Sequence, residues 1–134
     1  MIDIEDLRVG NFVTPKLYSE SHYYKVESIS ENKETITFTN ISKYAEPGNL
    51  KGEIALSACF LIPVTPELLE ACSFIQTSPQ VYVYDNMIVQ FKRYGIAHVQ
   101  ANKNDVQVAI EGVNELQNAY RHFTNKELNI VFNY

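Results

Sequence analysis

Three histidines, His22, His98 and His122, are the side chains of this chain best suited to metal binding or proton transfer. They fall in three separate predicted elements, which are a loop, a strand and a helix. No spacing between them matches a metal-binding motif. We therefore interpret each histidine as a surface or hydrogen-bonded residue, and the sequence assigns no metal ligand.

Glu67 and Glu70 stand three residues apart in a predicted helix and share one helix face. A general acid needs a carboxyl group whose pKa is raised by burial, whereas the start of a helix favours the ionised form. Ser57 lacks the flanking glycines of a nucleophile elbow, and the five glycines form no phosphate-binding cluster. We assign no catalytic or cofactor-binding residue, and we predict that the chain is not an enzyme.

The two cysteines, Cys59 and Cys72, form no CxxC motif and have no histidine at zinc-binding spacing. Both lie in apolar surroundings in the sequence. Free cysteines in such surroundings usually pack as small hydrophobic residues. We predict that both are buried and reduced.

Composition favours a folded, strand-rich protein. The 134 residues are 46% hydrophobic and 12% aromatic, with nine Tyr and seven Phe. The net charge of -5 disfavours direct nucleic-acid binding, because affinity for nucleic acid comes mainly from Lys and Arg that neutralise phosphates. Lys92 and Arg93 are the only adjacent cations. A basic surface on a host protein or ribonucleoprotein is electrostatically the easier partner.

The first residues, MIDIEDLR, are acidic and lead into no apolar run, so we expect no signal peptide. No apolar run approaches the ~20 residues that span a bilayer. The expected location is the cytoplasm, without membrane contact.

Residues 1–62 are predicted to form a small SH3-like barrel. Gly10 and Asn11 give a turn signal before the first strand. Strands over 23–29 and 35–41, joined by a polar turn, form a hairpin with threonines on its exposed face. A last strand over 54–62 ends at Pro63.

Residues 63–78 are predicted to form a short linking helix, with Thr65 as N-cap and Pro66 at the first helical position. Residues 79–134 should then form an antiparallel sheet. Its strands are expected over 81–84, 87–94, 96–101 and 106–110, and a final strand over 128–132 should return to it. The whole chain is predicted to be one α+β domain.

A C-terminal helix should cover this sheet with an apolar stripe formed by Val113, Leu116, Tyr120 and Phe123. Asn114 with Gln117 is the predicted N-terminal capping box. Thr124 and Asn125 should end the helix, because Asn tolerates the left-handed conformation common at helix C-termini.

Four aromatic residues of the predicted sheet allow two interpretations: Tyr82, Tyr84, Phe91 and Tyr94. They could form a stacking platform for single-stranded nucleic acid, with phosphate contacts from Lys92 and Arg93. We favour the alternative that they are core residues and cross-strand pairs. Candidate contacts with a protein partner lie on the outer face of the C-terminal helix and in the loops over 17–22 and 44–51: Tyr18, His22, Tyr44, Gln117, Asn118, Arg121 and His122.

Three segments resemble motifs of small uncharacterised proteins of Bacteroidetes genomes, prophages and mobile elements. DLRVGNFV at 6–13 resembles their LRIGN-x-V opening, and PVTPELL at 63–69 resembles their P-x-T-x-E-x-L centre. VNELQNAY at 113–120 with TNKEL at 124–128 resembles their LQNLY-x-x-LTGxEL closing motif. This chain has Ser73 and Asn125 where that pattern has Gly. At Asn114 it lacks the pattern's histidine.

The resemblance transfers no activity or catalytic residue; it implies a small accessory protein of phage or mobile-element origin. We expect a non-catalytic protein that binds and modulates another macromolecule. One concrete form is an inhibitor of a host defence system, such as an RNA-guided CRISPR nuclease. The alternative is a small hydrolase or nucleotide-binding enzyme whose site is assembled from scattered residues.

Overall fold

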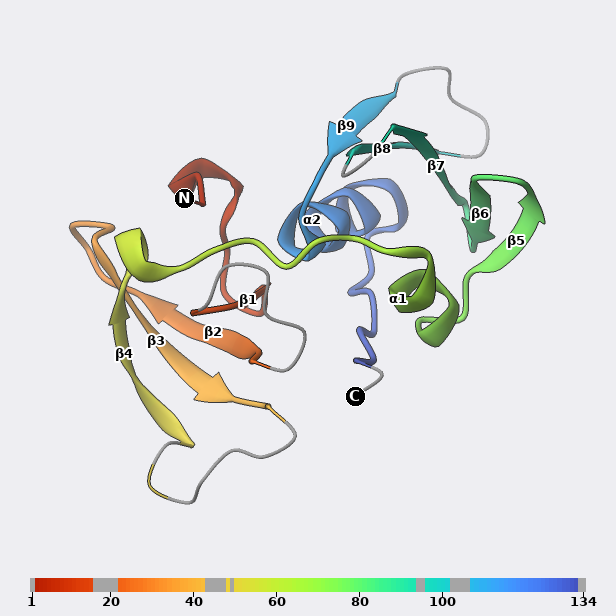
Figure 1. Ribbon diagram of the computed structural model, residues 1–134. Helices are drawn as coiled ribbons and strands as arrows, with labels where there is room; N and C mark the ends of the chain where they lie inside the picture. The colour runs from red at the N-terminus through yellow and green to blue at the C-terminus, as the bar shows by residue number, and fades with distance from the viewer. Residues whose placement is uncertain are drawn as a thin grey trace. The chain divides into compact units, whose positions relative to one another are not determined.

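The computed structural model describes residues 2–15, 22–42, 48, 50–93, 96–101 and 107–132 of the chain. The chain divides into two compact units, one ending at Ile62 and the other beginning at Pro63. Each unit contains one antiparallel sheet, and the second also contains the helices α1 (Pro66–Ala71) and α2 (Val113–Thr124) (Figure 1). The predicted α+β class, with two antiparallel sheets and a C-terminal helix, is confirmed.

The sheet of the first unit has the strand order β1-β2-β3-β4 and is preceded by the 3-10 turn η1 (Ile4–Asp6). The strands are β1 (Phe12–Val13), β2 (Tyr24–Ile29), β3 (Thr35–Asn40) and β4 (Lys51–Ala55). β2 and β3 form the predicted hairpin. Ile36, paired with Ile54, is buried, whereas Thr37, paired with Glu53, lies on the other face, half-buried. The predicted alternation is therefore observed at Ile36 and Thr37, but the three threonines of β3 are half-buried rather than exposed.

The core of the first unit contains a cluster of buried side chains: Ile2, Leu7, Val13, Val26, Ile36 and Cys59. The turn before β1 needs glycine at position 10, because the residue adopts a left-handed conformation with φ of 94°. The side chain of Asn11, fully buried, accepts a hydrogen bond from the backbone N–H of Arg8 at 2.7 Å. The opening motif is thus accounted for by turn chemistry and packing.

The predicted SH3-like barrel is not confirmed, because within the described ranges neither sheet closes into a barrel. The strand expected over 54–62 is also wrong as a continuous element. β4 ends at Ala55, the 3-10 turn η3 (Leu56–Ala58) follows, and Phe60 then forms an isolated bridge with Thr14. An apolar run in the sequence predicts that its residues are buried, but not which strand they pair with. β1 is also too short for the continuous hydrogen-bonded ladder that closes a barrel.

The sheet of the second unit has the strand order β5-β6-β7-β8-β9. The strands are β5 (Ile75–Ser78), β6 (Val81–Tyr84), β7 (Met87–Arg93), β8 (Ile96–Ala101) and β9 (Val108–Ile110). α2 packs against β7 and β8. The sheet face that carries the buried side chains of Tyr82, Val89 and Val99 is called the inner face. The helix stripe at Val113, Leu116 and Tyr120 is buried as predicted, whereas Phe123 is half-buried.

α1 begins as predicted: the Thr65 side chain accepts a hydrogen bond from the Leu68 backbone N–H at 3.1 Å, and Pro66 is the first helical residue. Beyond this helix, the linking segment differs from the prediction. The linking segment 63–78 contains the strand β5, because the chain reverses at Ser73, in a left-handed conformation with φ of 75°. Ile75 then pairs with Val83.

The N-terminus of α2 corrects the predicted capping box. The N-cap is Gly112, and the Glu115 side chain accepts hydrogen bonds from the backbone N–H groups of Gly112 and Glu111, both at 3.1 Å. Asn114 lies inside the first turn and is 2% exposed. The Glu115 carboxylate, at the third helical position, thus caps the helix in place of an N-cap side chain. The predicted C-terminal stop is confirmed, with Asn125 left-handed at φ of 59°.

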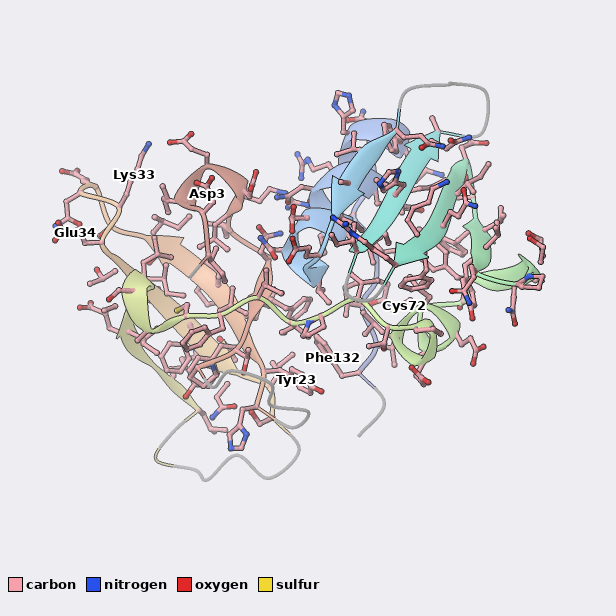
Figure 2. All side chains as sticks on the ribbon, turned by 45° about the horizontal axis from the view of Figure 1, so that its top comes forward. Asp3, Tyr23, Lys33, Glu34, Cys72 and Phe132 are labelled. Carbon is pink, nitrogen blue, oxygen red and sulfur yellow. The ribbon has the colours of Figure 1, made fainter. Side chains whose placement is uncertain are left out.

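The final strand predicted over 128–132 is wrong. Residues 127–132 form no strand, although Leu128 is buried. The segment instead contacts α1, since the Val131 backbone N–H donates to the Cys72 Sγ at 3.4 Å (Figure 2 labels Cys72 and Phe132). Alternating apolar residues indicate that one side of an extended segment is buried. Packing against a helix buries that side as well as pairing in a sheet would, so the pattern did not require a strand.

Candidate interaction surface

Two of the predicted partner contacts, Tyr18 and Tyr44, lie outside the described residues. His22 is described and exposed, in the first unit. The loops at 17–22 and 44–51 are described only at residues 22, 48, 50 and 51.

The predicted position of Gln117 on the exposed face of α2 is wrong, because this side chain is 2% exposed. Gln117 follows Val113 by four residues and precedes Tyr120 by three. That spacing puts it on the buried stripe of α2 rather than on the outer face. A polar residue inside a helical stripe cannot be placed by its polarity alone.

The other predicted contacts on α2 lie nearer to solvent. Asn118 is half-buried, and Arg121 and His122 are exposed. Arg121 forms an ion pair with Glu127, so its guanidinium group is engaged within the unit. The His122 ring lies 5.6 Å from the Phe123 ring, between centroids. This face is therefore partly committed to stabilising the end of its own helix.

A different surface, missed in the sequence, is formed by the outer face of the second sheet. Residues directly opposite in register share a face, so its members follow from the pairing of β5 to β9: Ile75, Ser78, Val81, Val83, Ile88, Gln90, His98, Gln100 and Ala109. In Figure 2 this face is turned toward the viewer, with α2 behind the sheet. We use the name outer face for these residues together with Lys92, Arg93, Ile96 and Gln107, which lie on the same side of the sheet.

One row of the outer face is aliphatic. Ile75, Val83 and Ile88 are consecutive partners across β5, β6 and β7. The Ile75 side chain is 69% exposed, while Val83 and Ile88 are half-buried. An isoleucine this exposed, next to two further branched side chains, provides an apolar contact area of the kind that protein interfaces use.

The neighbouring part of the outer face carries a chain of polar side chains on β8 and at Gln107, the residue before β9. Gln107 Nε2 donates a hydrogen bond to Gln100 Oε1 at 2.8 Å. Gln107 Oε1 lies 3.1 Å from His98 Nδ1 and is the acceptor of that bond, so the imidazole carries its hydrogen on Nδ1. Three side chains are held in fixed orientations without any carboxylate, so this part of the surface is polar and carries no acid.

The cations of the outer face lie at the end of β7. Side chains alternate between the two faces along β7, so Lys92 lies on the same face as Ile88 and Gln90. A bulge between Phe91 and Arg93 then pairs Arg93 with Ile96, which also lies on this face. Both cations are exposed.

The aromatic residues weighed as a nucleic-acid platform point to the inner side of the sheet. Tyr82 is buried and makes an edge-to-face contact with Phe91, with ring centroids 5.9 Å apart. Tyr84 stacks against Tyr120 on α2 at 5.9 Å and also contacts Phe74. For these three strand residues the interpretation as core and cross-strand pairs is confirmed, whereas Tyr94 lies outside the described residues.

A polar network fixes the β6–β7 turn to α2. The Tyr120 hydroxyl donates a hydrogen bond to Asp85 Oδ2 at 3.0 Å, and Lys126 Nζ lies 3.7 Å from the same oxygen. Asp85 adopts a left-handed conformation with φ of 54°. Burial, followed by the Asp85 hydrogen bond and charge, raises the pKa of Tyr120. The network joins the β6–β7 turn to the C-terminal part of α2.

Both thiols are buried and free, as predicted. Burial raises the pKa of Cys59 to about 11. Burial also raises the pKa of Cys72, against the opposing effect of its hydrogen bond with the Val131 backbone. Neither thiol is therefore in the electropositive, exposed setting that activates a nucleophile.

The part of the chain that the structure describes contains no group of three or more His, Cys, Asp or Glu side chains able to hold a metal ion. In the same ranges, no helix is long and apolar enough to cross a bilayer. No protein-family model matches the chain, and no curated protein or solved structure is significantly similar to it. What the chain binds must therefore follow from its own surface.

The outer face was not predicted from the sequence because the strand β5 was not predicted. The signal was present, since Ile75-Gln76-Thr77-Ser78 contains two β-branched residues and is followed by a Pro79-Gln80 turn. The predicted helix was extended across this segment instead. Without β5 the sheet lacks its most exposed apolar side chain.

Proposed function

We propose that the chain is a non-catalytic protein that binds and modulates another macromolecule, and that the outer face of its second sheet is the contact surface. The single observation that carries this proposal is the exposed aliphatic row, with Ile75 69% exposed. α2 packs on the other side of the same sheet, at β7 and β8. An antiparallel sheet with one packed side and one open side commonly exposes polar residues on the open side. Here branched aliphatic residues take part of that side.

The motif resemblance gives this proposal its more specific form, a cytoplasmic accessory protein of phage or mobile-element origin. An inhibitor of a host defence system, such as an RNA-guided CRISPR nuclease, is one concrete example. The partner would be a host protein or ribonucleoprotein. No described constellation of residues favours the alternative of a small hydrolase or nucleotide-binding enzyme.

The test is affinity purification from the native host with the wild-type chain and two single variants. Ile75→Asp introduces a charge into the aliphatic row. Val9→Asp is the matched control, because Val9 is 53% exposed and lies in the first unit. Both substitutions are at exposed sites and should leave thermal unfolding within about 0.5 kcal/mol of wild type.

We expect a stoichiometric partner to be captured by the wild-type chain and by the Val9→Asp variant, and to be lost with Ile75→Asp. A partner that all three chains capture equally would show that the surface is elsewhere. Absence of any stoichiometric partner would refute a protein-binding function.

A further inference from the structure

In the second unit, the charged residues of the sheet are cations, whereas the described carboxylates lie outside the strands. The five strands contain no Asp or Glu, and their only formal charges are Lys92 and Arg93. The described carboxylates of the unit are located in the helices, turns and connecting segments: Glu67, Glu70, Asp85, Glu111, Glu115 and Glu127. A chain with a net charge of -5 thus exposes a sheet face on which every formal charge is positive.

The two cations of this face have no ion-pair partner among the described residues of the unit. Both Lys92 and Arg93 are exposed, and neither forms an ion pair with another described residue. Elsewhere in the same unit, Arg121 pairs with Glu127 and Lys126 lies beside Asp85. The cations at the end of β7 are therefore available to carboxylates or phosphates of a partner.

The outer face suits a polypeptide better than a nucleic acid. Single-stranded nucleic acids are bound by stacking their bases on aromatic rings. The described aromatic side chains of these strands are Tyr82, Tyr84 and Phe91, and all three lie on the inner side, where Tyr82 contacts Phe91 and Tyr84 stacks on Tyr120 of α2. The outer face instead provides the aliphatic row and the amide and imidazole groups of Gln100, Gln107 and His98.

The spacing on β7 defines what a bound segment would carry. Ile88 and Lys92 are four residues apart on one strand and one face, which corresponds to about 13 Å. An extended peptide that runs along β7 covers this distance with about four residues. Its apolar side chain would contact the row of Ile75, Val83 and Ile88, and its acidic side chain would reach Lys92 and Arg93.

We infer that the outer face binds an acidic polypeptide segment in which a branched aliphatic residue and a carboxylate are separated by about four residues. This inference rests on the proposed protein-binding function and names the chemistry of the partner. The aliphatic row gives contact area, and the cations select for acidic segments and orient them.

The experiment selects random linear peptides displayed on phage against the intact wild-type chain. Selected peptides are then titrated against Lys92→Glu/Arg93→Glu. The control is Lys25→Glu/Lys51→Glu, which makes the same change in net charge at two exposed lysines that flank Thr39 on the first sheet. Circular dichroism and thermal unfolding establish that each variant is folded. An oligodeoxythymidylate is titrated in parallel as the nucleic-acid probe.

We expect selected peptides to be enriched in Asp or Glu about four residues from Val, Ile or Leu. Their affinity should fall at least about tenfold with Lys92→Glu/Arg93→Glu and by less than about twofold with the control. Peptides with Lys in place of the acid should bind the Lys92→Glu/Arg93→Glu variant better than the wild type. Added salt should weaken wild-type binding, because these charges are exposed.

Selected peptides that lack acids, or that bind the charge-reversed variant unchanged, would overturn this inference and leave the protein-binding function intact. Stronger binding of the oligodeoxythymidylate than of any peptide, dependent on Lys92 and Arg93, would overturn it in favour of a nucleic acid. Selection of no peptide would also overturn it. The proposed function fails separately, when host purification yields no stoichiometric partner.

Discussion

Replacing Ser73 with glycine should stabilise this protein. Ser73 follows the last turn of α1 and has φ of 75°. Its backbone N–H donates to the Glu70 carbonyl at 3.1 Å, and the next N–H, of Phe74, donates to the Leu69 carbonyl at 2.9 Å. These two bonds form a Schellman motif, in which the left-handed position is usually glycine. Leu69 and Phe74 are buried, as the hydrophobic contact of that motif requires.

The magnitude follows from two opposing contributions. The left-handed conformation costs a residue with a Cβ atom about 1–2 kcal/mol, and Ser73→Gly removes this cost. Glycine also gains freedom in the unfolded chain, which offsets about 0.4–1 kcal/mol. Ser73 is exposed and its hydroxyl makes no hydrogen bond to a described residue, so no contact is lost. The net gain in the free energy of unfolding should be about 0.5–1 kcal/mol, or about 2–4 °C in Tm.

Thermal unfolding followed by circular dichroism measures this difference. Ser57→Gly is the matched control, because Ser57 is also exposed but lies in η3 without a positive φ. It should lower stability by about 0.5 kcal/mol through the entropy of the unfolded chain alone. Equal effects of the two substitutions, or destabilisation by Ser73→Gly, would refute the reasoning, because both would show that φ at position 73 does not decide the outcome.

Three further outcomes are expected. Tyr120→Phe should lower stability by about 1–2 kcal/mol at neutral pH, measured by urea unfolding, because Asp85 loses a hydrogen bond of 3.0 Å. Folding raises the pKa of Tyr120 above its ordinary value of 10.0. The stability linked to the Tyr120 proton is therefore present below pH 10.0 and is lost as the pH rises through the raised pKa. A difference in the free energy of unfolding between Tyr120→Phe and wild type that stays the same at high pH would contradict this. Gly52→Ala should lower the free energy of unfolding by about 1–3 kcal/mol, because the new Cβ would lie 3.0 Å from the Phe38 ring. That ring is stacked on the Tyr24 ring, with the centroids 3.9 Å apart. Gly48→Ala is the control and should leave stability unchanged, because a Cβ at that position meets nothing within 4 Å. At pH 8 neither Cys59 nor Cys72 should react with Ellman's reagent until the protein unfolds, because both are buried and burial holds the pKa of Cys59 at about 11; rapid reaction of a native thiol would show that its site opens to solvent.

Local signals in the sequence determined most element positions. Thr65 and Pro66 mark the start of α1 because a side-chain acceptor and a fixed φ are needed at a helix start wherever it lies in the fold. Asn125 marks the end of α2 for the corresponding reason at a C-terminus. Alternation in β2 and β3, with a polar turn between them, predicted the hairpin. Each of these features depends on interactions within a few residues, which a sequence displays directly.

Tertiary structure decided which extended segments pair and which faces stay open. The alternating residues at 128–132 pack on α1 without a ladder, and Ile75 to Ser78 form an edge strand where a helix end was expected. Gln117 is buried because its place on the α2 stripe outweighs its polarity. Pairing partners and buried faces depend on residues distant in the chain, so residue types alone did not indicate them. The outer face is the clearest case: its residues come from five strands, and only the register of those strands puts Ile75, Ile88 and Lys92 on one surface.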